Sequence, residues 1–543
     1  MALNSATIKS IQDIMRKDAG VDGDAQRLGQ LTWLLFLKIF DDREQEWEIT
    51  VKKYRSPIPE ELRWRNWAAD TEGLTGDGLL DFINNKLFPS LKGLSPEASP
   101  RHRVIHDVFE DAYQYMKNGT LVRQVINKIN ESLDFNRSED RHIFGDLYEQ
   151  ILKDLQSAGN AGEYYTPRAV TQFMVDMINP QLGETVLDPA CGTGGFLTCT
   201  IDNLRKQVKT PDDEELLQRS VQGIEKKPLP HLLCVTNMLL HGIDVPTNVR
   251  HDNTLARPLA SYGPKDRVDC IITNPPFGGM EEDGIETNFP QKFRTRETAD
   301  LFLVLILTLL KDGGRGAIVL PDGTLFGEGV KTTIKEKLLT ECNLHTIVRL
   351  PNGVFSPYTG IKTNLLFFIK GQPTKEIWYY EHPYPPGAKS YNKTKPIRIE
   401  EFDIEKAWWF GGEGIIREDI IREGEAPAEP NARATKRKSK TAMTSRTLPL
   451  SATPGTVRGS AGASPSPLDF THRVESPQAW RVSIEQIQAN GYNLDIKNPH
   501  DSSEAHADPD ELLADYQILM TELQQTRDRL KDELFHALEG STR

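Results

Sequence analysis

From about residue 162 onward, short runs rich in β-branched residues alternate with stretches of helical spacing. The runs cover residues 184–188, 221–224, 268–273, 316–320, 344–350 and 364–369. Strands that alternate with helices pair in parallel, so this pattern predicts an α/β fold with a doubly wound sheet. The last two runs flank an Asn352-Gly353 turn, and we expect them to form an antiparallel edge of the sheet.

The rest of the chain divides into segments of different composition. Residues 1–158 have helical spacing and predict a helical N-terminal domain, which the sheet domain follows at 159–423. Residues 424–467 contain no aromatic residue and carry seven basic against two acidic residues, which predicts a disordered insertion. Its basic run TKRKSK suits a phosphate backbone, although a solvated loop is the preferred interpretation. Residues 468–543 predict a C-terminal helix after Asp508-Pro509. Its apolar seam would pack either against a helix of a partner or against this chain itself.

Composition excludes several classes of protein. The longest uncharged apolar run, 301–310, is too short to span a membrane, and the N-terminus lacks the pattern of a secretory signal. The five cysteines are never spaced C-x-x-C, so neither a disulfide framework nor a thiolate metal site is expected. We therefore expect a cytoplasmic protein without a bound metal. The net charge of −13 argues against a free-standing nucleic-acid binder.

The first motif with chemical content is TVLDPACGTGGF, residues 185–196. It predicts a strand that ends at Asp188, then a glycine loop, then a helix. Glycines allow a ligand to approach the backbone, and the carboxylate can accept from an ammonium or hydroxyl group. The loop has no lysine or arginine, which argues against a triphosphate site. The next run ends at Glu225, where an acid can hold the two hydroxyls of a sugar.

The second motif is CIITNPPF, residues 270–277. Asn274 follows an apolar strand that a doubly wound sheet places next to the glycine loop. The side-chain oxygen of Asn274 and the carbonyl of Pro275 could accept both hydrogens of an exocyclic amine, and Phe277 could stack on a base. A turn that terminates the strand explains the tetrapeptide NPPF equally well when it is considered alone. Its occurrence together with the first motif favours a role in catalysis.

Together, DPACGTGG and NPPF resemble the S-adenosylmethionine loop and the catalytic loop of the amino-group DNA methyltransferases. Four further segments are similar to the methyltransferase (M) subunit of type I restriction-modification systems. They are residues 34–42 (LLFLKIFDD), 144–151 (FGDLYEQI), 162–168 (GEYYTPR) and 490–494 (NGYNL).

The resemblance implies S-adenosylmethionine as cofactor and a set of site residues. Those implied to close over its methionine end are Glu163, Tyr164, Tyr165, Thr166, Pro167 and Arg168, although either tyrosine could be a core aromatic. Asp188, Gly192, Thr193, Gly194 and Gly195 correspond to the glycine loop, and Glu225 to the ribose acid. Asn253, or its neighbour Asp252, corresponds to the residue beside the adenine. Asn274, Pro275, Pro276 and Phe277 correspond to the catalytic loop.

The implied function is methylation of adenine N6 in a base flipped out of double-stranded DNA. The implied partners are a separate specificity subunit, a second copy of this chain and a restriction (nuclease) subunit. Alternatives are a stand-alone methyltransferase that acts on RNA or on a protein glutamine amide, a non-catalytic scaffold, and cytosine N4 as the target atom. Because the chain is acidic, we expect it to bind DNA weakly by itself.

Overall fold

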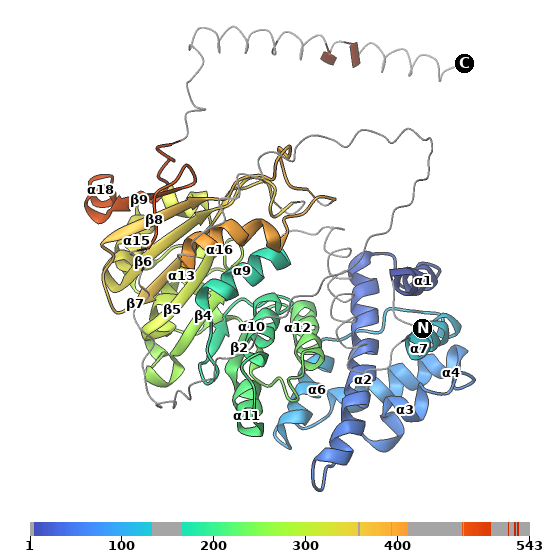
Figure 1. Ribbon diagram of the computed structural model, residues 1–543. Coiled ribbons are helices and arrows are strands. Elements are labelled where there is room, and N and C mark those ends of the chain that lie inside the picture. Colours follow the sequence, from blue (N-terminus) through green and yellow to red (C-terminus); the bar gives the residue numbers. More distant parts are fainter. Residues whose placement is uncertain are drawn as a thin grey trace, which may run out of the picture.

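The computed structural model describes three stretches of the chain (Figure 1). They are residues 5–132, 166–410 without 278, 357, 358 and 393, and 470–500 without 471, with single residues at 520, 526, 527, 529 and 530. Residues 133–158 of the expected helical domain, the expected insertion at 424–467 and nearly all of the expected C-terminal helix lie outside the described residues.

The first described stretch is entirely helical, as predicted. Its elements are α1 (Ser5–Met15), α2 (Asp24–Thr50), η1 (Glu60–Leu62), α3 (Trp64–Trp67), α4 (Gly76–Asp81), η2 (Phe82–Leu87), α5 (Phe88–Lys92), α6 (Pro100–Glu110) and α7 (Gly119–Ser132). The long helix α2 provides much of the core, because Trp33, Phe36 and Phe40 are fully buried. Trp33 and Phe36 meet Phe88 and Phe109 in edge-to-face contacts, which hold α2 against α5 and α6.

The second part is a nine-stranded sheet in the order β3-β2-β1-β4-β5-β7-β6-β8-β9. The strands are β1 (Val186–Asp188), β2 (Val221–Glu225), β3 (Val249–His251), β4 (Val268–Thr273), β5 (Leu310–Pro321), β6 (Cys342–Arg349), β7 (Thr363–Lys370), β8 (Glu376–Glu381) and β9 (Ala479–Ser483). The strands from β3 to β5 pair in parallel, which confirms the doubly wound half of the sheet.

The predicted antiparallel pair of β6 and β7 is confirmed, but it does not form the edge of the sheet. Strand β7 also pairs antiparallel with β5, and β8 and β9 extend the sheet beyond β6. The expectation that the sheet ends near Ile369 was therefore wrong. The edge strand β9 comes from residues assigned to the C-terminal segment, and backbone hydrogen bonding to β8 brings it back to the sheet.

Helices cover both faces of the sheet. The connecting elements are α9 (Arg168–Ile178), α10 (Gly195–Arg205), α11 (Pro211–Ser220), α12 (Pro228–Leu240), η3 (Thr254–Ala256), η4 (Leu259–Ser261), η5 (Pro264–Asp266), η6 (Ile285–Asn288), η7 (Gln291–Phe293), α13 (Thr298–Leu309), α14 (Asp322–Phe326), α15 (Val330–Glu341), η8 (Ile399–Phe402), α16 (Asp403–Phe410) and α18 (Ile484–Ala489). Helices α9 and α16 share one apolar core with one face of the sheet, and α13, α15 and α18 share another core with the opposite face. Successive strand residues alternate between these two cores.

The helical domain contacts the sheet domain through α12, which lies between α10 and α2 (Figure 1). Nearly every residue of α12 is buried. The contact includes an ion pair between Arg43 and Asp244, and Nδ1 of His251 lies 3.3 Å from a carboxylate oxygen of Asp111. No helix among the described residues is long and apolar enough to span a membrane.

Candidate active site

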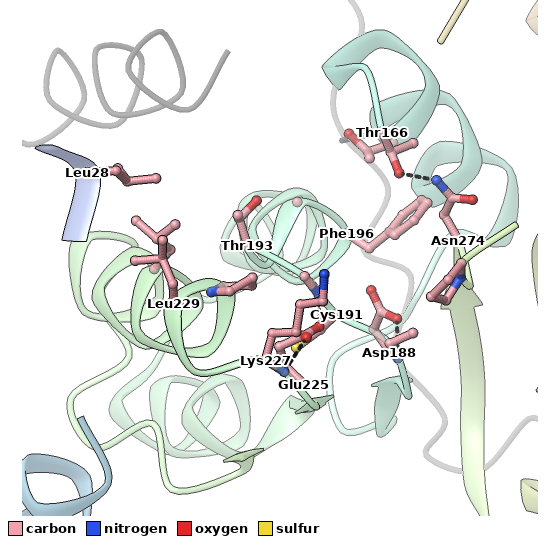
Figure 2. Close-up of a pocket in the computed structure, with 17 residues that line it drawn as sticks. Leu28, Thr166, Asp188, Cys191, Thr193, Phe196, Glu225, Lys227, Leu229 and Asn274 are labelled. Atoms are coloured by element: carbon pink, nitrogen blue, oxygen red, sulfur yellow. Dashed lines mark hydrogen bonds between the residues drawn. The ribbon is translucent and has the colours of Figure 1, made fainter. Parts of the chain in front are cut away.

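The two sequence motifs meet at the carboxyl ends of neighbouring strands. Strand β1 lies between β2 and β4, so Asp188, Glu225 and Asn274 follow three adjacent parallel strands. A pocket opens above them, and Figure 2 shows Asn274 and Thr166 on the side opposite Leu28 and Leu229. The predicted residues that line this pocket are Thr166, Asp188, Gly192, Thr193, Gly195, Glu225, Asn274 and Pro276. The topology therefore brings eight of the predicted residues together at one pocket.

The glycine loop passes beneath the pocket in a left-handed backbone conformation. Gly192 has a φ of 53° and Gly194 a φ of 86°, values that side chains disfavour. A Cβ at Gly194 would stand 2.8 Å from Sγ of Cys234 on α12, whereas a Cβ at Gly192 would meet nothing within 4 Å. Gly194 therefore permits close packing of the loop on α12. Gly192 lines the pocket and leaves open space there.

Glu225 fixes the loop from the next strand. Its Oε2 accepts from the backbone N–H of Gly192 at 2.9 Å, and its Oε1 accepts from the backbone N–H of Lys227 at 2.7 Å. Each carboxylate oxygen has a second lone pair, so the same group can also accept from hydroxyls in the pocket. The carboxylate thus joins the glycine loop to the start of α12 and lines the pocket as well.

Asp188 is almost fully buried at the end of β1, with 1% of its surface exposed. One oxygen, Oδ1, accepts from the hydroxyl of Thr273 at 2.7 Å and from the backbone N–H of Ala190 at 3.1 Å. Burial raises the pKa of Asp188 to about 7, despite the two hydrogen bonds, and the charge of Glu225 raises it further. A cation in the pocket would favour the ionised form.

Asn274 has an oriented side chain with one unused acceptor. Its Nδ2 donates to the hydroxyl of Thr166 at 2.7 Å (Figure 2). Its Oδ1 is buried and has no hydrogen-bond partner among the residues that the structure describes. A buried acceptor without a partner costs about 1–3 kcal/mol, so it is expected where a ligand supplies the donor.

Other predicted residues lie next to the pocket but do not line it. Pro167 is the N-cap of α9, and Arg168 contacts α10, where its guanidinium donates to Thr198 at 2.7 Å and to Asp202 at 2.9 Å. Pro275 and Phe277 are buried, and the ring of Phe277 meets that of Phe355 edge to face at 6.1 Å. Gly194 faces α12 rather than the pocket. Glu163, Tyr164 and Tyr165 lie outside the described residues.

Asn253, which was predicted to lie beside the adenine of the cofactor, makes local hydrogen bonds instead. Oδ1 of Asn253 accepts from the backbone N–H of Leu255 at 3.0 Å and caps η3, and its Nδ2 donates to Glu281 at 3.4 Å. The neighbouring Asp252 is exposed. Neither side chain lines the pocket.

Several pocket residues were not predicted. They are Leu28, Thr171, Ala190, Cys191, Phe196, Lys227, Leu229, Pro230 and Leu233. The start of α12 could have been found, since it follows Glu225 within a few residues and must begin at the same edge of the sheet. Leu28 could not, because it comes from the helical domain, and helical spacing does not indicate which element of the sheet domain α2 contacts.

Comparison with known proteins identifies the family of this chain. The family model described as N-6 DNA Methylase matches residues 139–416, and the HsdM N-terminal domain model matches residues 4–129. The chain is 57% identical over 540 residues to the type I restriction enzyme EcoEI methylase subunit of Escherichia coli, with 99% of each chain covered.

Two solved structures show the same architecture along almost the whole chain. One is a modification subunit of a putative type I restriction enzyme from Vibrio vulnificus YJ016, at 41% identity and a TM-score of 0.74, covering 92% of this chain and 98% of that one. The other belongs to a study of complex assembly in the type I R-M system, at 34% identity and a TM-score of 0.73, covering 98% and 99%. With the Asp188, Glu225 and Asn274 site in place, this protein belongs to the methylase subunits of type I restriction-modification enzymes, and it is a DNA methyltransferase with an N6 methylase domain.

Proposed function

We propose that the pocket between Asp188, Glu225 and Asn274 binds S-adenosylmethionine and that Asn274 presents the N6 amine of an adenine to it. N6 DNA methyltransferases use this cofactor in general. The observation that carries the proposal is the buried Oδ1 of Asn274, to which none of the described residues 5–132, 166–410 and 470–500 donates a hydrogen bond. An exocyclic amine supplies that donor.

The residues of the pocket fit the cofactor. Its ammonium group suits the buried carboxylate of Asp188, its ribose hydroxyls suit Glu225, and the open backbone at Gly192 allows close approach. The apolar side chains of Leu229 and Leu233 can contact a flat base. Thr166 to Arg168 begin α9 beside the pocket, and Glu163, Tyr164 and Tyr165 are proposed to complete its methionine end. Asn253 or Asp252 is proposed to reach the adenine only after a local rearrangement.

When bound, the cofactor supplies an electrophilic methyl group on a sulfonium. Asn274 and the Pro275 carbonyl accept the two N6 hydrogens, which favours a tetrahedral nitrogen whose lone pair faces the pocket. Positioning then contributes most of the rate, and the proton released from the methylated amine needs no strong base. Pro276 stands exposed at the mouth, and Phe277 stacks on the flipped base once its ring leaves Phe355.

The test is Asn274→Ala, with transfer of a labelled methyl group to DNA and cofactor binding measured on the same sample. We expect loss of transfer and a cofactor Kd within about twofold of the wild type, since Asn274 contacts the amine. Asn352→Ala is a matched control, because Asn352 is exposed at the same edge of the sheet. Full activity of Asn274→Ala would contradict the assignment.

We further propose that a separate specificity subunit reads the DNA sequence, in an assembly with a second copy of this chain and a nuclease subunit. The support is the net charge of −13, which gives the chain little general attraction for duplex DNA. The purified chain is then expected to bind DNA weakly and to methylate it only after the specificity subunit is added. Methylation of a defined site by the chain alone would contradict this division of labour.

A further inference from the structure

An exposed aromatic side chain lies at the edge of the sheet that carries the active site. Phe326 is the last residue of α14, which begins directly after β5, and 53% of its surface is exposed. Strand β5 pairs in parallel with β4, and Ile318 stands opposite Thr273, the residue before Asn274. The segment after β5 therefore emerges at the same edge as the catalytic loop.

The backbone on both sides of Phe326 is held by a buried lysine. Nζ of Lys335 donates to the carbonyl of Leu325 at 2.6 Å and to the carbonyl of Gly327 at 2.8 Å. Lys335 is only 2% exposed, so these carbonyls must compensate the loss of water around its ammonium. The backbone N–H of Leu494 also donates to the carbonyl of Leu325 at 3.1 Å. The structure thus fixes the backbone of a residue whose own side chain is turned to solvent.

The same segment is connected to the catalytic loop through the start of α13. Lys331 donates to Glu297 at 2.5 Å and to Asp300 at 2.7 Å. Thr298, the first residue of α13, donates through its hydroxyl to the carbonyl of Gly279 at 2.9 Å. The start of α13 therefore contacts both the first turn of α15, which follows the segment of Phe326, and the chain after the NPPF motif.

Other exposed side chains at this edge of the sheet suit a nucleic acid. Residues 361 and 362 immediately precede β7 at this edge, and the carbonyl of Lys362 accepts from the backbone N–H of Asp322. Ile361 is exposed there, as is Met280 after the catalytic motif. Exposed apolar side chains beside an exposed lysine can contact bases and a phosphate respectively.

We propose that Phe326 is a wedge that enters the base stack of duplex DNA next to the target adenine and fills the space that the flipped base leaves. An apolar side chain that inserts between base steps offsets part of the cost of unstacking, which amounts to a few kcal/mol. The inference rests on the proposed function of Asn274, because it requires that the target base leave the duplex. It assigns to Phe326 the opening of the duplex and to Asn274 the transfer.

The test compares two DNA duplexes that contain the mapped target site, with the complex of this chain and its specificity subunit as enzyme. In one duplex the target adenine is paired with thymine, and in the other it faces an abasic site. We expect Phe326→Ala to slow methylation of the paired target at least tenfold and of the abasic duplex less than twofold. The fluorescence of 2-aminopurine at the target position should rise less than in the wild type.

Three variants make the result specific. Asn274→Ala should lose methylation of both duplexes to the same extent. This pattern separates a failure of methyl transfer from a failure to open the duplex. Phe326→Leu, which keeps an apolar side chain, should methylate the paired duplex faster than Phe326→Ala. Ile404→Ala removes a similarly exposed side chain on α16 and should match the wild type. Equal rates for Phe326→Ala and wild type on the paired duplex, or an equal loss on both duplexes, would overturn the proposal.

Discussion

The side-chain amide of Asn274 donates to the hydroxyl of Thr166, across 108 residues of sequence. This hydrogen bond joins the catalytic loop after β4 to the segment that leads into α9. It also decides which end of the amide is available, since Nδ2 is occupied and Oδ1 is left as a buried acceptor. The orientation of the proposed catalytic group is therefore set by a residue outside its own motif.

The first prediction concerns that orientation. Thr166→Val keeps the shape of the side chain but removes the acceptor, so the amide of Asn274 loses its fixed orientation. We expect kcat for methyl transfer to fall about tenfold or more, in the range of a lost hydrogen bond to a reacting group. Thr166→Ser retains the hydroxyl and should keep most of the activity. An unchanged kcat in Thr166→Val would show that Asn274 is oriented by other contacts.

The meeting of Thr166, Asp188 and Asn274 shows how much the sequence predicts. Each of the two motifs ends an apolar run, and parallel pairing then requires their polar residues to share one edge of the sheet. This argument predicts that the strands of the two motifs are neighbours and that their polar residues meet, without any knowledge of side-chain geometry. It does not predict the hydrogen bond to Thr166, because the direction of a side chain depends on packing that no local pattern records.

The strands β3, β8 and β9 illustrate the opposite case. Strand β3 has three residues, too few for a periodic signal, and β9 is separated from its partner β8 by nearly a hundred residues. Their places in the sheet are determined by long-range hydrogen bonds.

Phe277 was predicted to offer its ring to a base, yet the ring is buried beside Phe355. The sequence could not distinguish these roles, because an aromatic residue after a strand suits either one.

The second prediction concerns Glu225. Glu225→Gln replaces one acceptor oxygen by an amide donor, so it cannot accept from both Gly192 and Lys227 as the carboxylate does. We expect the cofactor Kd to rise about tenfold to a hundredfold, which corresponds to about 1.4–2.7 kcal/mol. Binding of a cofactor analogue without ribose hydroxyls provides the control. If Glu225 acts mainly through the hydroxyls, the analogue should bind the wild type and the variant with similar affinity, whereas a similar loss for the analogue would assign the effect to the glycine loop that Glu225 holds.

The third prediction compares two glycines of one loop. Gly194→Ala places a methyl group against Cys234 at a positive φ, so we expect a loss of several kcal/mol in the free energy of unfolding. Gly192→Ala meets only open space and should cost about 1 kcal/mol, while its methyl group narrows the site and weakens cofactor binding. Thermal unfolding and a binding titration measure the two effects. Similar melting temperatures for both variants would contradict the packing argument.

The last prediction concerns pH and Asp188. Burial raises the pKa of this carboxyl to about 7, so half of the unliganded protein carries a neutral Asp188 at that pH. The ionised form disfavours the folded state, and the contribution of Asp188 to stability is greatest at low pH and is lost as the pH rises through 7. Cofactor binding has the opposite dependence, because the ammonium group needs the ionised acceptor. Affinity should therefore increase with pH below 7, by up to about tenfold per unit, and level off above it.

Calorimetry on the wild type and on Asp188→Asn checks this coupling. In the wild type, the cation favours the ionised carboxyl, so binding near pH 7 should release a proton, seen as a heat that depends on the ionisation enthalpy of the buffer. Asp188→Asn is similar in size but does not titrate, and it should bind more weakly, with no proton release from this position. Any pH dependence that remains in the variant belongs to the cofactor's own amino group and is subtracted. A wild-type profile identical to that of Asp188→Asn would mean that the carboxyl does not contact the ammonium group.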